Sequence, residues 1–166
     1  MSAGADDRLA QAAALREAGK LEEALPLLLE LRRELPDDPQ VAIQTAWTHD
    51  SLGLEEEAPH YEAALAAGLP DDQARGAYLG FGSTLRTLGR DAESERVFRE
   101  GIERFPDFLP LRVFNAMLEY NLGRPRDAVF ALIEVLLKAT DDPTILRYRR
   151  SLGGYAEDLD RSWLQG

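Results

Sequence analysis

The feature that most constrains this chain is a glycine that recurs at a nearly fixed spacing. Gly19, Gly53, Gly89 and Gly123 follow one another at intervals of 34, 36 and 34 residues, and a helix-compatible stretch flanks each of them. Repeats of this length are typical of stacked helical hairpins, in which each hairpin buries its apolar face against its neighbours. Such a stack presents an extended concave surface rather than a single catalytic cleft. The spacing therefore predicts a binding scaffold.

The expected helix ends repeat with the same period. Each glycine supplies a left-handed stop after a first helix, because it has no Cβ to clash. Proline and aspartate then separate one hairpin from the next, since proline ends a helix and aspartate caps the following one. These junctions are Pro36-Asp37-Asp38, Pro70-Asp71-Asp72, Pro106-Asp107 and Asp141-Asp142-Pro143. The expected repeats cover about residues 5–38, 39–72, 75–108 and 109–142.

Small and large apolar residues recur with the same spacing as the glycines. The small positions, where paired helices must approach closely, are Ala12, Ala46, Gly82 and Ala116 in the first helices and Ala24, Ala58, Ser94 and Ala128 in the second helices. Large apolar residues follow along the second helices at Leu28, Leu31, Tyr61, Leu65, Val97, Phe98, Ile102, Leu132 and Val135. Their spacing predicts one apolar stripe per helix, packed against its neighbours.

A last amphipathic segment, about residues 143–164, follows the fourth repeat. Its apolar residues recur every three or four positions, which is one face of a helix. They are Ile145, Leu146, Tyr148, Leu152, Tyr155, Leu159 and Trp163. A capping helix over the end of the stack is the preferred interpretation, and a dimerisation helix is the alternative. Gly153-Gly154 is the expected position for any break in this segment.

Composition fits one soluble domain. With 166 residues, 45% of them apolar, the chain can bury a core over its whole length as a single unit. It has no cysteine, which excludes disulfides and thiolate chemistry. No secretion signal is seen, and no apolar run reaches the ~18 residues of a membrane span, so we expect a cytoplasmic protein that does not bind membranes.

The net charge of −11 lies entirely in the first half of the chain. Residues 1–72 carry 5 Lys+Arg against 16 Asp+Glu, whereas residues 73–166 carry 14 of each. Nucleic-acid binding needs clustered cations, so no nucleic-acid partner is expected. The acidic half is interpreted as a solvated outer face, and a partner with a basic patch is the alternative.

The pattern resembles the tetratricopeptide repeat family. The likeness rests on the two small positions, the turn glycine and the closing prolines Pro36, Pro70 and Pro106, and it covers about residues 5–142. Residues 73–160 also resemble a bacterial subgroup of small tetratricopeptide proteins. The resemblance implies an all-α, right-handed solenoid of four helix-turn-helix repeats plus a C-terminal cap. It also implies a protein or peptide as the partner, bound along the concave groove.

In this family one face of each first helix forms the groove. The matching positions give the predicted binding residues Gln44, Trp47, Gly80, Ser83, Arg86, Phe114, Met117, Tyr120, Asn121, Arg147 and Tyr148. Trp47 is interpreted as a recognition residue, and Phe114 and Met117 fit either the groove or a core covered by the cap. An interior glycine costs ~1 kcal/mol relative to alanine, so Gly80 with Ser83 is interpreted as a low floor for a ligand side chain.

Arg86 and Arg147 are the expected cations of this groove. Some family members bind acidic chaperone C-termini through a clamp of lysine, asparagine and arginine. The corresponding places here hold Leu9, Ala13, Gln44, Gly76 and Gly80, so that function is not implied.

Enzymatic motifs are missing from the sequence. The two histidines, His49 and His60, belong to different helices of the second repeat and lack the tight spacing of zinc ligands. We expect His49 in the packing seam and His60 at the surface, and neither a metal nor another cofactor. The sequence predicts a non-catalytic module, either a monomer or a weak homodimer. Structural self-association is the alternative function.

Overall fold

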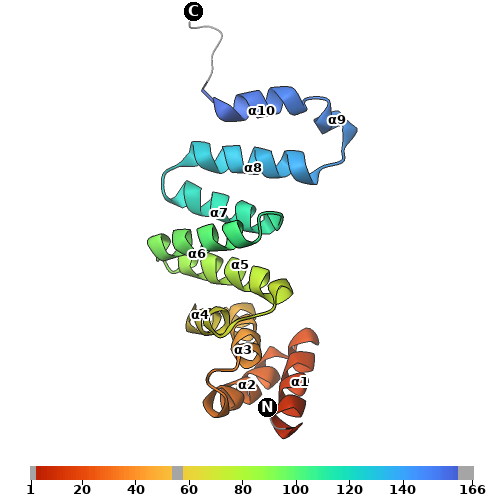
Figure 1. Ribbon diagram of the computed structural model, residues 1–166, viewed down its shortest axis with the longest axis vertical. Helices are drawn as coiled ribbons and strands as arrows, with labels where there is room; N and C mark the ends of the chain where they lie inside the picture. The colour runs from red at the N-terminus through yellow and green to blue at the C-terminus, as the bar shows by residue number, and fades with distance from the viewer. Residues whose placement is uncertain (1–2, 54–57, 161–166) are drawn as a thin grey trace, which may run out of the picture. The chain divides into compact units, whose positions relative to one another are not determined.

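The chain folds into consecutive helical hairpins (Figure 1). The computed structural model describes residues 3–53 and 58–160, and all regular secondary structure in those ranges is helical. The hairpins are α1 (Ala3–Glu17) with α2 (Leu21–Glu34), α3 (Pro39–Leu52) with α4 (Ala58–Ala67), α5 (Asp71–Thr87) with α6 (Asp91–Arg104), and α7 (Leu109–Asn121) with α8 (Pro125–Ala139). Two short helices follow, α9 (Pro143–Leu146) and α10 (Arg149–Glu157). The prediction of an all-α fold built from four hairpins is confirmed.

The turn glycines end the first helices as predicted. The φ angles of Gly19, Gly53, Gly89 and Gly123 are 74°, 67°, 70° and 74°, which is left-handed backbone that residues with a Cβ rarely adopt. In the first turn, the amide N of Lys20 donates to the carbonyl of Leu15 at 2.9 Å. The glycines that recur in the sequence therefore mark a backbone conformation that recurs in the structure.

Two of the predicted aspartate caps form, and two do not. The carboxylate of Asp38 accepts hydrogen bonds from the amides of Gln40 and Val41 at 2.9 and 3.0 Å, and Asp142 accepts from Thr144 at 2.8 Å. Helix α5 begins at Asp71 and α7 follows Phe108, and neither start has a side-chain cap. At these junctions the preceding proline marks the boundary without a capping aspartate.

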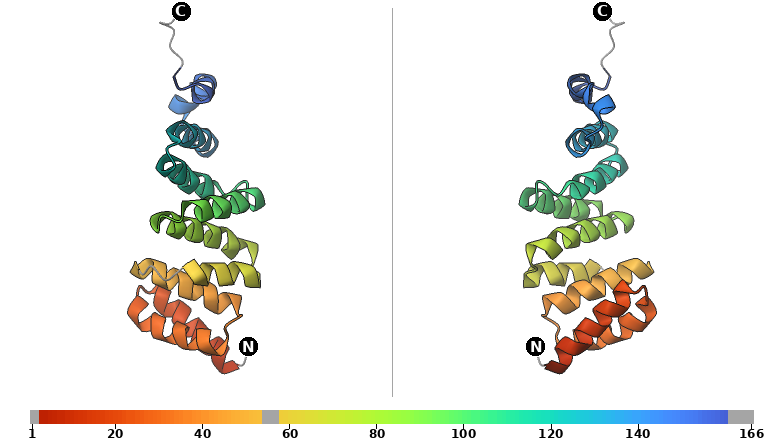
Figure 2. Two further views of the ribbon diagram at one scale, coloured as in Figure 1. Left: turned by 90° about the vertical axis from the view of Figure 1, so that its left-hand side faces the viewer. Right: turned by 90° about the vertical axis from the view of Figure 1, so that its right-hand side faces the viewer.

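Contacts divide the chain into two compact units, Met1–Val97 (the first unit) and Phe98–Gly166 (the second unit). Within the first unit, α1 packs on α2, α2 on α3, α3 on α4 and α4 on α5 (Figure 2). Within the second unit, α7 and α10 both pack on α8. Helix α6 crosses the boundary between the units. The expectation of one continuous domain stays a prediction.

The small positions are buried where the helices approach closely. Ala12 and Ala46 are fully buried, and Ala116 is nearly so. The hydroxyl of Ser94 in α6 donates to the backbone carbonyl of Gly82 in α5 at 2.7 Å, which requires the two backbones to lie close together. The side chain of Ala58 lies outside the described set. The predicted close-packing register is confirmed at the described positions.

The C-terminal segment covers part of α8. Ala156 of α10 is buried, and a guanidinium N–H of Arg149 donates to the carbonyl of Leu137 in α8 at 2.8 Å. The helix break lies at Arg147–Tyr148 rather than at Gly153-Gly154, which lie inside α10. Packing of α10 on α8 offsets the low helix propensity of the two glycines. Trp163 lies outside the described residues.

Candidate binding site

Trp47 lies between neighbouring helices of the first unit. Its ring is half-buried on α3, while Thr48 and His49 beside it are buried. The guanidinium carbon of Arg16, from α1, lies 5.2 Å from the centroid of the Trp47 ring. This is the geometry of a cation–π contact. The tryptophan is therefore held by its neighbours rather than standing alone on the surface.

Gln44 fixes the arginine that covers Trp47. The side-chain oxygen of Gln44 accepts a hydrogen bond from Nε of Arg16 at 2.8 Å. Gln44 and Trp47 are three residues apart on α3, so their side chains share one face of the helix. Arg16 also lies 3.8 Å from a carboxylate oxygen of Glu17. Arg16 is therefore held on the ring of Trp47 by Gln44, and the terminal N–H groups of its guanidinium can donate hydrogen bonds to a ligand.

Gly76 of α5 lies beside the same ring. A Cβ built at Gly76 would be 4.0 Å from a ring carbon of Trp47, an ordinary van der Waals distance. The indole is thus bordered by α1 through Arg16 and by α5 through Gly76. Ser83 and Arg86 lie further along α5 and are half-buried.

The interpretation of Gly80 as a low floor for a ligand is wrong. A Cβ at Gly80 would overlap the phenol ring and hydroxyl of Tyr61, which is fully buried. The hydroxyl of Tyr61 donates to the carboxylate of Asp50 at 3.1 Å, and its ring lies 6.3 Å from that of Phe81. Gly80 therefore accommodates a core tyrosine from α4. The space above it is already filled by the protein itself.

The other predicted binding residues belong to the second unit. Met117 and Tyr120 of α7 are 44% and 70% exposed, so Met117 is not a core residue. Phe114 is half-buried, and Asn121 is exposed. The remaining pair is Arg147 and Tyr148, in which the guanidinium carbon lies 5.6 Å from the tyrosine ring centroid. Aromatic surface is present on this unit, as the sequence predicted.

The histidines form a stacked pair in the first unit. The ring centroids of His49 and His60 are 5.0 Å apart, with 19° between the ring planes. His49 is buried as predicted, and its Nδ1 donates to the carbonyl of Thr45 at 3.0 Å. His60 is half-buried, so the prediction that it lies at the surface is wrong. Burial of its ring, with added repulsion from His49 and Arg32, lowers the pKa of His60 to about 4.

Arg16 is the site residue that sequence reasoning missed. It stands at the same repeat position as Arg86, four residues after the small residue of its first helix. The predicted groove residues all lie in later repeats, so Arg16 of the first repeat was not among them. The matching register of Arg16 and Arg86 was the available signal.

Comparison with known proteins identifies the class. Residues 39–159 match the family model described as the tetratricopeptide repeat. The chain belongs to the tetratricopeptide repeat family.

One solved structure shares the fold, and a second is a weaker match. A mutant of MamA superimposes with a TM-score of 0.70 at 19% sequence identity, over 81% of this chain and 79% of that chain. A thermophilic tetratricopeptide repeat protein from Thermus thermophilus gives a TM-score of 0.44 at 18% identity, over 89% and 98% of the two chains. None of the curated proteins matches this chain. The likeness to MamA shows that the chain has the fold of an α-solenoid of helix-turn-helix repeats.

The described residues also bear on metal sites and on membrane spans. No three His, Asp or Glu side chains gather there as metal ligands would. None of the helices in residues 3–53 and 58–160 has the length and apolar character needed to cross a membrane.

Proposed function

We propose that this protein is a non-catalytic scaffold that binds a protein or peptide, and that Trp47 is the centre of its binding surface. Tetratricopeptide repeat proteins generally mediate contacts between proteins, which supports this class of function. The surface is formed by the first helices of the first unit, α1, α3 and α5. Gln44, Ser83 and Arg86 belong to it together with Arg16.

The single observation that carries this proposal is the contact of Arg16 with Trp47 and Gln44. A side chain already held in place loses little conformational entropy when a ligand binds to it. A bound segment would set an apolar side chain against the indole and a carbonyl or carboxylate oxygen on the guanidinium. Arginine suits this role because its planar fork donates two parallel hydrogen bonds.

The predicted residues of the second unit extend the proposal. Phe114, Met117, Tyr120, Asn121, Arg147 and Tyr148 are proposed to contact the same class of partner. Exposed tyrosine is typical of recognition surfaces, since its ring offers a large contact area with few rotatable bonds. Their participation is tested separately from that of Trp47.

Peptide selection followed by mutation tests the groove. Random peptides displayed on phage are selected against the wild-type chain, and their binding to Trp47→Ala and Arg16→Ala is then measured by fluorescence anisotropy. Truncating an aromatic anchor should weaken binding by about thirtyfold, corresponding to ~2 kcal/mol. Glu103→Ala, an exposed change on α6, serves as the control. Selected peptides that bind both variants as tightly as wild type would place the binding surface elsewhere.

A second candidate function is self-association, favoured by the apolar residues of α8. Val129, Leu132 and Leu136 share one face of this helix and are 40–44% exposed. Leu132 occupies the repeat position of Leu28 and Phe98, which are both fully buried. Leu132 was predicted to lie in a packing stripe, but a large part of its side chain is exposed.

A second copy of the chain would complete this packing. The second unit carries 10 Lys+Arg against 11 Asp+Glu, so charge repulsion between two such surfaces is small. Sedimentation across about a hundredfold concentration range should show a dimer in equilibrium with monomer. Leu132→Lys should remove the dimer, and Glu103→Lys should not. A monomer at every concentration would exclude this function.

A further inference from the structure

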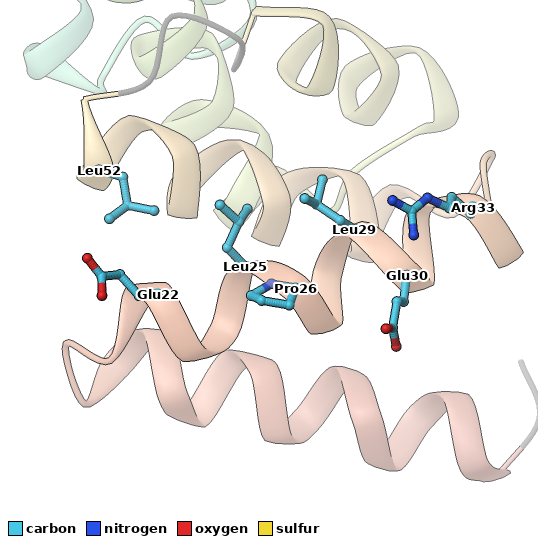
Figure 3. Close-up of a pocket in the computed structure, with 7 residues that line it drawn as sticks. All are labelled: Glu22, Leu25, Pro26, Leu29, Glu30, Arg33 and Leu52. Carbon is cyan, nitrogen blue, oxygen red and sulfur yellow. The ribbon is translucent and has the colours of Figure 1, made fainter.

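A groove runs along α2, on the side where Leu25 and Leu29 point away from α1 (Figure 3). One hollow of about 370 Å³ is lined by Glu22, Leu25, Pro26, Leu29, Glu30, Arg33 and Leu52. A second hollow of about 290 Å³ is lined by Gly19, Lys20, Leu21, Glu22, Glu23 and Leu52. The two hollows share Glu22 and Leu52, so they form one continuous groove, which we call the α2 groove.

The leucines of the α2 groove are less buried than the residues that pack α2 against its neighbours. Helix α2 buries Ala24, Leu28 and Leu31, whereas Leu25 and Leu29 are only half-buried. At the repeat positions of Leu25 and Leu29, α6 has the charged residues Glu95 and Arg99, and α8 has the apolar residues Val129 and Ile133. Leu25 and Leu29 point towards α3, and both remain partly exposed where α2 and α3 border the hollow (Figure 3). A partly exposed apolar pair beside a hollow indicates a contact surface.

The polar groups around the α2 groove are mainly hydrogen-bond acceptors. Glu22 and Glu30 lie on its border, and Arg33 is the one cation among the described residues lining the larger hollow. Pro26 lies inside α2 and has no N–H, so the carbonyl of Glu22 lacks its usual helical donor four residues on. In the smaller hollow, Lys20 is paired with Glu23 at 3.2 Å. The first unit as a whole carries 9 Lys+Arg against 19 Asp+Glu.

We propose that the α2 groove binds a cationic amphipathic helix of a partner protein. Leucines of that helix would pack on Leu25, Leu29 and Leu52, while its lysines or arginines would reach the carboxylates of Glu22 and Glu30. A negative field favours the approach of such a partner and disfavours acidic ones. The proposal goes beyond the function proposed for Trp47, because its surface is formed by α2 and by Leu52 at the end of α3, and includes none of the residues around Trp47.

The spacing of the two glutamates specifies the pattern of the ligand. Glu22 and Glu30 are eight residues apart, which is about 12 Å along a helix at 1.5 Å per residue. A helix lying along α2 therefore needs cations seven or eight positions apart, with apolar residues on the same face between them. That pattern is common in basic amphipathic helices and absent from acidic or purely polar segments.

Three labelled peptides of equal length test the proposal against the full chain. The first combines leucine and lysine in this pattern, the second replaces its leucines by serine, and the third replaces its lysines by glutamate. Binding is measured by fluorescence anisotropy at physiological salt. The leucine–lysine peptide should bind about tenfold or more tightly than the other two, because apolar contact and charge both contribute. Equal binding of the serine–lysine peptide would overturn the proposal.

Two variants locate the binding. Leu29→Lys should weaken the leucine–lysine peptide by about tenfold or more, by removing apolar contact and adding repulsion. Glu30→Lys, an exposed change that spares the core, should weaken it by about three- to fivefold. Glu103→Lys on α6 alters net charge equally and should change the affinity by less than about twofold.

A variant of the Trp47 surface separates the two proposed binding surfaces. Trp47→Ala should leave peptide binding unchanged, so failure of the Trp47 surface and failure of the α2 groove are distinguishable. No binding of the leucine–lysine peptide, or an equal loss in Glu30→Lys and Glu103→Lys, would overturn the assignment of the groove.

Discussion

The two units of this protein are built from one repeat, but their surfaces differ in charge and in exposed apolar area. The first unit has a net charge of −10, and the second has a net charge of −1. The large apolar side chains that are exposed in the described residues all lie in the second unit: Met117, Tyr120, Val129, Phe130, Leu132, Leu136, Tyr148, Tyr155 and Leu159. Repeat packing constrains only the residues between helices, so the outward positions were able to diverge. The first unit carries most of the negative charge, which favours cationic partners, and the second unit carries the large exposed apolar side chains.

The largest expected effect tests whether both units share the same packing rule. Ala46 and Ala116 hold the same small position, one in each unit, and both are buried. Ala46→Leu and Ala116→Leu should each lower the free energy of unfolding by about 3 kcal/mol, because overpacking forces helices apart. Denaturant titration measures both. A variant with unchanged stability would show that its unit tolerates a wider helix crossing than the repeat predicts.

A smaller effect is expected at two glycines of α5. Gly80→Ala should cost about 2 kcal/mol, since its methyl group would meet the buried ring of Tyr61. Gly76→Ala, the matched control, only touches Trp47 and should gain ~0.5–1 kcal/mol from helix propensity. The second unit has Phe114 at the position of Gly80, so this constraint belongs to the first unit. Equal stability of the two variants would contradict the role assigned to Tyr61.

Acid should affect the first unit through its histidine pair. The folded pKa of His60 is lowered to about 4 from an ordinary value of 6.5, so the unfolded chain takes up a proton first as the pH falls. The stabilisation is complete above pH 6.5 and is lost progressively between about pH 6.5 and 4. The shift alone corresponds to about 3 kcal/mol, and solvent screening of the half-exposed ring reduces this to about 1–2 kcal/mol.

The variant His60→Gln separates the contribution of His60 to the pH dependence of stability from that of the carboxylates. The loss of stability between pH 7.5 and 5 should be smaller in His60→Gln than in wild type, as measured by urea unfolding at about ten pH values. Parallel curves for the two proteins would show that His60 titrates alike in the folded and unfolded chain.

The smallest effects concern the helix caps. Asp38→Ala in the first unit should cost about 1 kcal/mol, because two amides of α3 lose their acceptor. Asp142→Ala in the second unit should cost a few tenths of a kcal/mol, since α9 is a single turn. Thermal unfolding compares them. Asp38→Asn keeps an accepting oxygen and should be nearly neutral, and a full loss in that variant would argue against capping.

Local features of the fold were predictable from the sequence. Gly19 and Gly89 end helices through their own φ angles, and Asp38 caps α3 through amides two and three residues away. Each of these depends on a few neighbouring residues, which is why the repeat boundaries could be read from glycine, proline and aspartate. The buried register of Ala46 followed from the same periodicity.

Contacts between helices were harder to predict. Gly80 is explained only by Tyr61, which comes from another helix and is 19 residues earlier in the chain. The stacking of His60 on His49 and the covering of Trp47 by Arg16 likewise join different helices. Periodicity predicts which face a side chain occupies, but the partner depends on the size and shape of residues across the interface. Trp47 was therefore found as a candidate, while its guanidinium partner was not.

The covered indole makes the protein its own optical reporter. Trp47 and Trp163 are the only tryptophans of the chain, so Trp163→Phe leaves one tryptophan, which is in contact with Arg16. Indole emission responds to nearby charge and to water, and both change when a ligand settles on the ring or moves the guanidinium aside. A change in the fluorescence of Trp47 in unlabelled protein would therefore report the binding of a partner, whatever its identity.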